Sequence, residues 1–354
     1  MWAMIVKEFR QVRRDRRTLA MMIVLPILLL VVLGYAASFD VPTITVAAAG
    51  PQASSVSGLL RAPFSVVSQE PDQGRDWAQN QLRDGRANVA VVTGGSRPEV
   101  LIDGSQLFAA RATLTALAKL ESTVSPPGTA GTATATAAVA SPSVTVLYNP
   151  DLNTSDIMIP GLAGVVLVFI GTIITSLGVV RERQSGTLEQ LAVMPLRPRD
   201  VFLGKIVPYF AVAAVDLAIV LAVGIAVFGV PFRGSPAVFG LGALLFLFVT
   251  LGIGVLISSV SQNQGQAIQL AVMTMLPQVL LSGLIFPLSS IAIGVRWIAY
   301  LLPLTYFNEI SKGVMLRAEP LGPLWLPFTC LAVLGAVVVT AATLRFRRFL
   351  APAG

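Results

Sequence analysis

Long apolar runs separated by short polar segments dominate the pattern of this 354-residue chain. An α-helix needs about 20 mostly apolar residues to cross the hydrocarbon core of a bilayer. Six runs approach this length, at residues 19–39, 157–180, 206–230, 237–260, 265–286 and 322–344. The pattern therefore predicts an all-α membrane bundle of six spanning helices.

Basic residues predict the side of the membrane on which each connecting segment lies. Six Lys/Arg residues precede the first run, five lie within 181–205, and three follow the last run. Short cytoplasmic segments carry such an excess of positive charge. We therefore expect both termini and 181–205 in the cytoplasm, with residues 40–156 outside. A cleaved signal peptide is the alternative for the first run, although this run exceeds the roughly 7–15 apolar residues of such peptides.

The predicted outside segment, residues 40–156, differs in composition from the rest of the chain. Short β-branched runs bounded by Gly, Pro and Asp predict strands at VPTITVAAAG, RANVAVVTG, PEVLIDG and PSVTVLYNP. RDWAQNQLRDG and SQLFAARATLTALAKLES have the apolar spacing of helices. These elements predict a small inserted α/β extracellular domain, with a disordered loop at the uncharged, Ala/Thr-rich residues 125–143. A passive insertion and a lid over the membrane domain are both open interpretations.

Two shorter apolar pieces, separated by Pro303, occupy residues 287–321 before the last run. Each piece is too short to cross a bilayer comfortably, and irregular backbone at membrane depth must be shielded by protein or water. We interpret this region as a re-entrant helical hairpin that enters from outside. A plain extracellular amphipathic hairpin is the alternative. With the surrounding runs, the region completes a predicted five-span domain at 157–354.

Two further polar features accompany the apolar runs. Residues 1–18 place apolar and basic side chains on different faces of a helix, which predicts a cytoplasmic amphipathic helix at the headgroups or a basic anchor for the first span. Asp216 stands alone within the run 206–230. An intramembrane carboxylate is costly, so we expect it to face the bundle or a cavity. It would contact a proton or substrate, or join two helices by a hydrogen bond.

The composition narrows the chemistry further. Hydrophobic residues make up 55% of the chain and charged residues 12%, against about 25% charged in a soluble domain. The chain has no His, and its one cysteine, Cys330, lies in an apolar run, so neither a His-ligated metal nor an intrachain disulfide is expected. Neither a Walker A pattern nor a Gly-x-Ser-x-Gly elbow occurs. The net charge of +7 comes from cations that flank apolar runs, so we expect no nucleic acid and no catalytic residues.

Several segments resemble the permease subunit of the ABC type-2 exporter family. They are KEFRQVRRDRRTLAMMIVLP, YNPDLNTSDIMIPGL, RERQSGTLEQLAVMPLRPRDVFLGK, LLSGLIFP and YLLPLTYFNEISKGV. The resemblance covers nearly the whole chain and implies a dimer of six-span permeases, formed by two copies or by one copy and a paralogue. It also implies a dimer of separate cytosolic ATPase subunits. These subunits would bind ATP and Mg²⁺, so this chain itself needs no cofactor.

In this family the loop after the second span forms a coupling helix that fits the ATPase, which here implies residues 181–205. The positions that match the family motif are Glu182, Gly186, Thr187, Glu189, Leu191, Pro195, Gly204 and Lys205. Ser185 or Thr187 suits a helix N-cap, and Glu189 would lie near the positive end of the helix dipole. An ordinary positive-inside linker is the alternative. The predicted exit gate in the hairpin consists of Pro287, Pro303, Tyr306 and Glu309.

The expected function is export of an amphiphile, such as a lipid, glycolipid or hydrophobic drug, across a bacterial inner membrane. The resemblance implies that ATP hydrolysed by the partner ATPase moves the coupling helices and thereby the spans. Membrane lipids are expected as surroundings. The alternatives are an ion-driven secondary transporter with Asp216 as its proton site and a receptor-like membrane protein acting through its extracellular domain.

Overall fold

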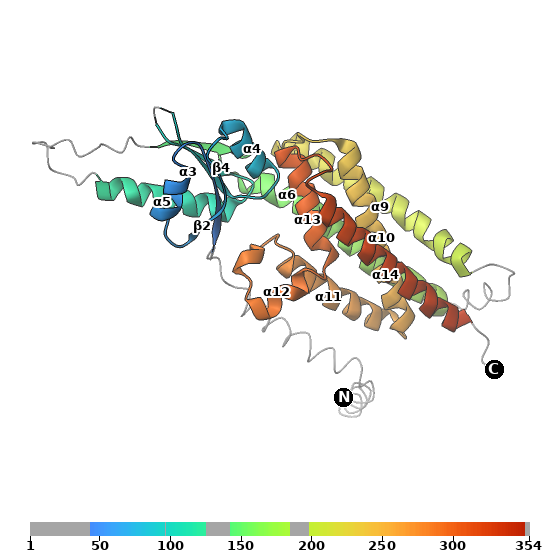
Figure 1. Cartoon of the computed structure of the whole chain (residues 1–354). Helices are drawn as coiled ribbons and strands as arrows, with labels where there is room; N and C mark the ends of the chain where they lie inside the picture. The colour runs from blue at the N-terminus through green and yellow to red at the C-terminus, as the bar shows by residue number, and fades with distance from the viewer. Residues whose placement is uncertain (1–42, 96, 125–141, 185–197, 351–354) are drawn as a thin grey trace, which may run out of the picture.

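A computed structural model describes residues 43–95, 97–124, 142–184 and 198–350. It shows a sheet domain and a helical domain that extends away from it (Figure 1). The predicted first span 19–39, the predicted helix 1–18 and most of the predicted loop 125–143 lie outside these residues. Within them, the combination of a small mixed α/β sheet domain with apolar helices confirms the predicted class in its coarse form.

The sheet domain is built on five strands. They are β1 (Ile44–Ala49), β2 (Phe64–Glu70), β3 (Val89–Val92), β4 (Glu99–Asp103) and β5 (Ser143–Leu147). Their order in the sheet is β2-β1-β3-β4-β5, and only the β3–β4 pair is antiparallel. Four strands match predicted runs. β2 was not predicted, and β5 begins inside the predicted loop 125–143.

Helices cover both faces of this sheet because both faces are apolar. The helices are α3 (Ala53–Leu59), α4 (Arg75–Arg83) and α5 (Leu107–Val124). Successive residues of a strand point to opposite faces. Ala47 of β1 accordingly packs with Leu82 of α4, whereas its neighbour Val46 packs with Ala110 of α5. The two predicted helices therefore correspond to α4 and α5.

Four helices of the described chain are long and apolar enough to cross a membrane. They are Thr154–Arg181, Tyr209–Phe228, Pro236–Val260 and Trp325–Arg345. They lie within the elements α6 (Thr154–Val168), η1 (Phe169–Ile174), α7 (Thr175–Gln184), α9 (Pro198–Phe228), α10 (Pro236–Val260) and α14 (Trp325–Leu350). They correspond to the predicted spans 157–180, 206–230, 237–260 and 322–344. The helices α9, α10 and α14 contact one another, and their axes have similar orientations (Figure 1).

The predicted fifth span, 265–286, corresponds to α11 (Gln264–Leu281). This helix is not among the four that are long and apolar enough to cross. Polar residues such as Gln266 and Gln278 are buried along it, and the chain turns after it through Gly283, whose φ is +78°. The count of six spans therefore stays a prediction.

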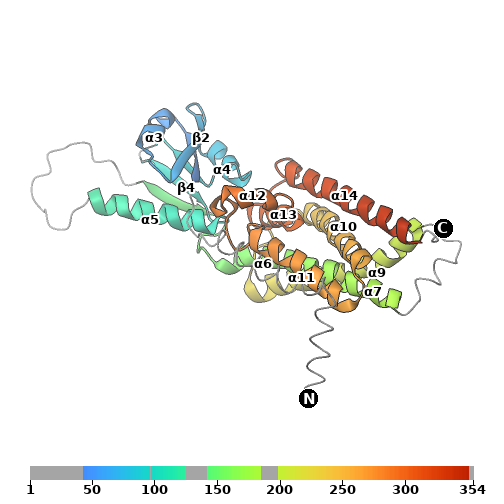
Figure 2. The ribbon, with the colours of Figure 1, turned by 90° about the horizontal axis from the view of Figure 1, so that it is seen from below.

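Residues 287–321 form a helical hairpin. Its elements are η2 (Leu288–Ser290), α12 (Ile293–Ala299) and α13 (Pro303–Arg317). Pro303 begins α13, where its missing N–H costs no helical hydrogen bond. All but two residues of α13 are buried, and Phe307 stacks on Phe246 of α10 with ring centroids 4.5 Å apart. Figure 2 shows α12 and α13 between the sheet domain and the long helices.

The second predicted span is an unbroken helical rod formed by α6, η1 and α7, in which η1 is a π-helix. Glycines set its packing, since small residues allow helices to approach closely. A Cβ at Gly164 would lie 2.5 Å from Leu304 of α13, and a Cβ at Gly171 would lie 2.5 Å from Thr250 of α10. The rod therefore packs tightly against both the hairpin and α10.

Candidate site at the junction of the two domains

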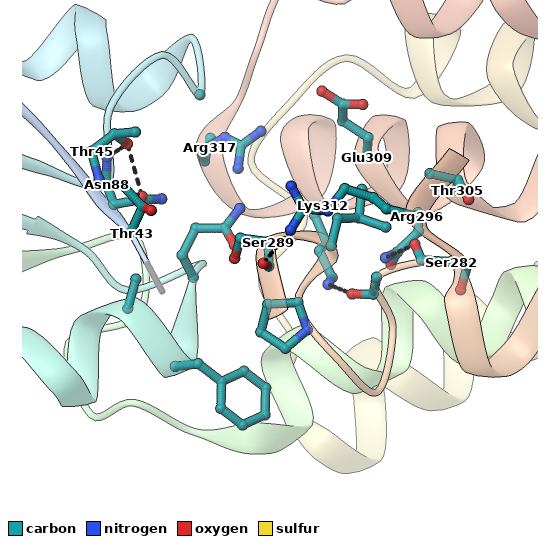
Figure 3. Close-up of a pocket in the computed structure, with 18 of the residues that line it drawn as sticks. Thr43, Thr45, Asn88, Ser282, Ser289, Arg296, Thr305, Glu309, Lys312 and Arg317 are labelled. Carbon is teal, nitrogen blue, oxygen red and sulfur yellow. Dashed lines mark hydrogen bonds between the residues drawn. The ribbon is translucent and has the colours of Figure 1, made fainter. Parts of the chain in front are cut away.

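A cavity of about 650 Å³ lies where the sheet domain meets the hairpin. Its wall combines the starts of β1 and β3 with the turn after α11 and with α12 and α13. Figure 3 shows Thr45 and Asn88 on one side and Arg296 and Lys312 on the other. Cavities of about 300–1,000 Å³ hold small ligands in many proteins.

Thr45 and Asn88 form a fixed polar pair on the sheet-domain wall. The backbone N–H and the hydroxyl of Thr45 donate to Asn88 Oδ1, at 3.1 and 2.8 Å, and the Asn88 N–H donates to Thr45 Oγ1 at 3.0 Å. Because a backbone N–H can donate only to the oxygen of the amide, these bonds define which end is Nδ2. Asn88 Nδ2 itself donates to no described residue.

The hairpin wall carries two cations. Arg296 donates to backbone carbonyls, with Nη2 at 2.6 Å from Ser289 O and 2.9 Å from Ile291 O. Lys312 is 9% exposed, and its Nζ donates to Gly283 O at 3.4 Å. Neither side chain forms an ion pair with a carboxylate in the described part of the chain. This wall of the cavity therefore carries two cations without an ion-pair partner, together with the carboxylate of Glu309.

Unsatisfied polar atoms lie beside these cations. Asn308 Nδ2 donates to Ser282 O at 3.3 Å. Asn308 Oδ1 and Ser282 Oγ are buried and have no hydrogen-bond partner among the described residues. A buried polar atom without a partner costs about 1–3 kcal/mol. The cavity wall thus keeps hydrogen-bonding capacity that the protein itself does not use.

A buried ion cluster joins the two domains next to the cavity. Arg317, at the end of α13, lies 3.0 Å from Glu319 Oε1 and 3.8 Å from Asp103 Oδ2 of β4. It also donates to Ser105 Oγ at 3.1 Å. Arg317, Glu319 and Asp103 are all at most 4% exposed. A Cβ at Gly313 would collide with Glu319 Oε2, so a larger residue there would require the Glu319 carboxylate to move away from its present position.

Burial dominates the protonation of the two carboxyl groups. It raises the pKa of Glu319 to about 7, and the neighbouring Arg317 offsets only part of the rise. Burial likewise raises the pKa of Asp103, against the opposing effect of Arg317. Loss of solvation disfavours the charged form of a carboxyl group. Burial therefore favours the protonated form of Glu319 more than it is favoured in an exposed glutamate.

The four predicted gate residues all lie in the hairpin, but only two reach the cavity. Pro287 and Glu309 line it, and Glu309 makes no ion pair with a described residue. Pro303 begins α13, and the Tyr306 hydroxyl donates to Tyr300 O at 2.6 Å. Their role as an exit gate stays a prediction.

The predicted coupling residues fall mostly outside the described part of the chain. Gly186, Thr187, Glu189, Leu191 and Pro195 lie in the segment 185–197, which is not described. The backbone of Glu182 belongs to α7, and that of Gly204 and Lys205 belongs to α9. The separate intramembrane candidate Asp216 is half-buried in α9.

Sequence reasoning missed the cations and the ion cluster at the junction. The available signal for these residues was that a largely apolar stretch is interrupted by Arg296, Lys312 and Arg317. A buried charge requires a partner or a role. The partner of Arg317, Asp103, lies more than 200 positions earlier, so no local pattern connects them. Within the described residues, no group of three or more Asp, Glu or Cys side chains is placed to hold a metal ion.

The long apolar helices, together with the sheet domain that precedes them, define a multi-pass membrane protein. The profile of the family described as "ABC-2 family transporter protein" matches residues 16–344. The chain therefore belongs to this family, and the predicted permease class is confirmed.

Curated relatives agree with this assignment. The chain is 36% identical over 201 residues to "Probable multidrug ABC transporter permease YbhR" of Escherichia coli (strain K12), covering 57% of this chain and 55% of YbhR. It is 28% identical over 344 residues to "Probable multidrug ABC transporter permease YbhS", covering 90% of this chain and 88% of YbhS. It is 31% identical over 205 residues to "Inner membrane transport permease YhhJ", covering 57% and 54%. The matches thus span about half the length of YbhR and YhhJ and most of YbhS.

Proposed function

We propose that this chain is the permease subunit of an ATP-driven exporter that moves amphiphilic molecules outward across a bacterial inner membrane. The family match over residues 16–344 carries the proposal. The substrates would be lipids, glycolipids or hydrophobic drugs, and the names of YbhR and YbhS, which mention multidrug transport, support the last class. A separate cytosolic ATPase subunit hydrolyses ATP with Mg²⁺, and this chain is not itself an enzyme.

The arrangement of helices supplies a route for mechanical coupling. The segment 185–197 joins α7 to α9, so a partner that pushes on this segment moves the cytoplasmic end of the rod formed by α6, η1 and α7. The outer half of the same rod packs against α13 through Gly161 and Gly164. Movement at the cytoplasmic end would therefore reach the hairpin and the cavity without an intermediate element.

The proposed topology has six spans, with both termini in the cytoplasm and the sheet domain outside. The described helices account for four spans, and 19–39 and α11 would supply the others. The burial of α13 among other helices supports a re-entrant hairpin, since irregular backbone at membrane depth must be shielded by protein. Similarity to two different permeases of one organism supports pairing with a paralogue, and a homodimer is the alternative.

The test is ATPase coupling. The chain is co-purified with a candidate ATPase subunit, reconstituted in liposomes, and the rate of ATP hydrolysis is measured with and without an amphiphile. We expect the permease to change the basal rate and Glu189→Lys to abolish the change, because a reversed charge in the coupling loop weakens docking on the ATPase. Glu70→Lys, which reverses a charge on the exposed end of β2, is the matched control.

An ATPase rate that ignores the permease, together with no effect of Glu189→Lys, would contradict the proposal. The ion-driven alternative is separated from it by Asp216→Asn. This substitution would abolish proton-dependent transport but would leave ATP-dependent transport intact.

A further inference from the structure

The junction cavity is lined by two cations, Lys312 and Arg296, that form no ion pair in the described part of the chain, and by one carboxylate, Glu309. Lys312 presents three donor protons but makes one long bond of 3.4 Å to Gly283 O. Asp103 attracts it electrostatically but makes no ion pair with it, because Asp103 and Glu319 pair with Arg317 in the ion cluster. A buried ammonium group without a partner is costly. A ligand anion in the cavity would supply the missing partner.

Unused donors line the same cavity as Lys312. Asn88 Nδ2 is oriented by the bonds that Thr45 makes to the amide oxygen, and it has no acceptor among the described residues. The buried Ser282 hydroxyl also has no partner there. An anionic oxygen accepts from several donors at once. These groups come from both domains, so a bound anion would bridge the sheet domain and the hairpin.

Exposed apolar side chains begin at the cavity wall. Ile293 of α12 lines the cavity and is 84% exposed. Trp297 follows one helical turn later and Leu301 lies in the turn after α12, and they are 59% and 58% exposed. Residues four apart lie on the same face of a helix. An alkyl chain attached to the anion could therefore leave the cavity along an apolar strip.

We propose that the junction cavity binds amphiphiles with an anionic phosphate or carboxylate head group, with Lys312 as the counter-ion and Asn88 and Ser282 as hydrogen-bond donors. The inference rests on the proposed export function, since it names the substrate class that the outer end of the permease selects. Arg296 adds to the positive potential of the cavity but is held by backbone carbonyls.

Direct binding tests the inference without any ATPase, so its failure is separate from a failure of coupling. The purified full chain in an uncharged maltoside detergent is titrated with dodecyl phosphate, with dodecyltrimethylammonium and with inorganic phosphate, and binding is measured by isothermal calorimetry. We expect dodecyl phosphate to bind more tightly than the other two ligands. Equal affinity for the cationic amphiphile would show that the site does not select an anionic head group. Equal affinity for inorganic phosphate would show that the alkyl chain does not contribute to binding.

Variants locate the site. Lys312→Met keeps most of the side-chain length and should weaken dodecyl phosphate binding by about tenfold or more, because a hydrogen bond to a charged group is lost. Asn88→Asp keeps the oxygen that accepts from Thr45 and replaces the Nδ2 donor by a carboxylate, so it should have an effect of similar size even if Lys312→Met fails to fold. Arg111→Gln removes a cation on the exposed surface of α5 and should leave binding unchanged.

One further experiment distinguishes a membrane lipid from an exported amphiphile as the source of the head group. Nanodiscs made only of zwitterionic lipid are compared with nanodiscs containing an anionic phospholipid, and dodecyl phosphate is titrated into both. Weaker apparent binding in the anionic nanodisc identifies a membrane lipid as an occupant, and equal binding assigns the cavity to exported amphiphiles. If wild type and Asn88→Asp bind dodecyl phosphate equally in the zwitterionic nanodisc, the inference is wrong.

Discussion

Removal of Arg317 is the sharpest perturbation of the domain junction. Arg317→Met keeps much of the side-chain volume but removes the charge that Glu319 and Asp103 share. The two carboxyl groups are at most 2% exposed, so water cannot replace the guanidinium. Loss of one partner from a buried pair costs about 3–5 kcal/mol. We expect a decrease of this size in the free energy of unfolding at about pH 8, where both carboxyl groups carry charge in the unfolded chain.

The size of the loss should depend on pH with a defined sign. Without Arg317, the native pKa values of Glu319 and Asp103 rise further above those of the unfolded chain, because the cation no longer offsets burial. The native variant then holds more protons than its unfolded state. Its stability therefore increases as pH falls, by up to about 1.4 kcal/mol per pH unit for each carboxyl group. The difference from wild type should be smaller at about pH 5.5 than at about pH 8.

Denaturant titration of the full chain in detergent measures this difference at both pH values. The matched control is Arg75→Met, which breaks the Arg75–Glu99 pair. That pair has a similar distance of 3.1 Å, but the Arg75 side chain is 51% exposed. An exposed pair contributes about 0–1 kcal/mol. Equal losses for Arg317→Met and Arg75→Met, or a loss that does not shrink at low pH, would refute the interpretation of the cluster as a buried electrostatic link.

Three other substitutions follow from the same structure. Glu319→Gln should flatten the pH dependence of stability. The native pKa of about 7 exceeds the ordinary value of 4.5, so the stability of the wild type falls as pH rises between these values. An unchanged slope of stability against pH in denaturant titrations would contradict this. Ala318→Gly should stabilise the chain by roughly 0.5–1 kcal/mol, because Ala318 ends α13 with a φ of +54°; a lower melting temperature would count against it. Gly254→Val should destabilise by roughly 1–3 kcal/mol, because its Cβ would lie 2.9 Å from Thr175. Gly240→Val on the same helix, where the Cβ meets open space, is the control, and equal melting temperatures for the two variants would argue against close packing at Gly254.

The sequence predicts elements well where one physical signal dominates. The β-branched runs of β1, β3, β4 and β5 and the apolar lengths of α10 and α14 were sufficient, because burial on a sheet or in a bilayer selects those residues directly. β2 was missed because four of the seven residues in FSVVSQE are polar, and the strand lies at the edge of the sheet. α11 was predicted as a span from its apolar residues, and two of its glutamines, Gln266 and Gln278, are buried in the protein.

The site was less accessible to sequence reasoning than the fold. Pro287 and Glu309 were selected from the hairpin pattern and do lie on the cavity wall. The cations Lys312 and Arg296 could be recognised as unpaired only from their distances to carboxylates, which the sequence does not give. Asn88 and Asp103 lie side by side because β3 and β4 form an antiparallel pair of consecutive strands, but the contact of Asp103 with Arg317 of the hairpin is long-range in the sequence. A charged residue in an apolar stretch therefore marks a position that needs a partner, but the sequence does not show which residue that partner is.

The π-helix η1 has a consequence for how this protein tolerates length changes. A π-helical turn accommodates one residue more than an α-helical turn, and each residue of an α-helix advances the rotational phase by about 100°. Deletion of one residue within Phe169–Ile174 would remove the extra residue, so an uninterrupted α-helix would keep nearly the same rotational phase between α6 and α7. Gly178 would still face Tyr209 of α9 while Gly164 faced the hairpin. The same deletion in an α-helical part of the rod would instead rotate α7 by about 100° relative to α6 and separate these contacts.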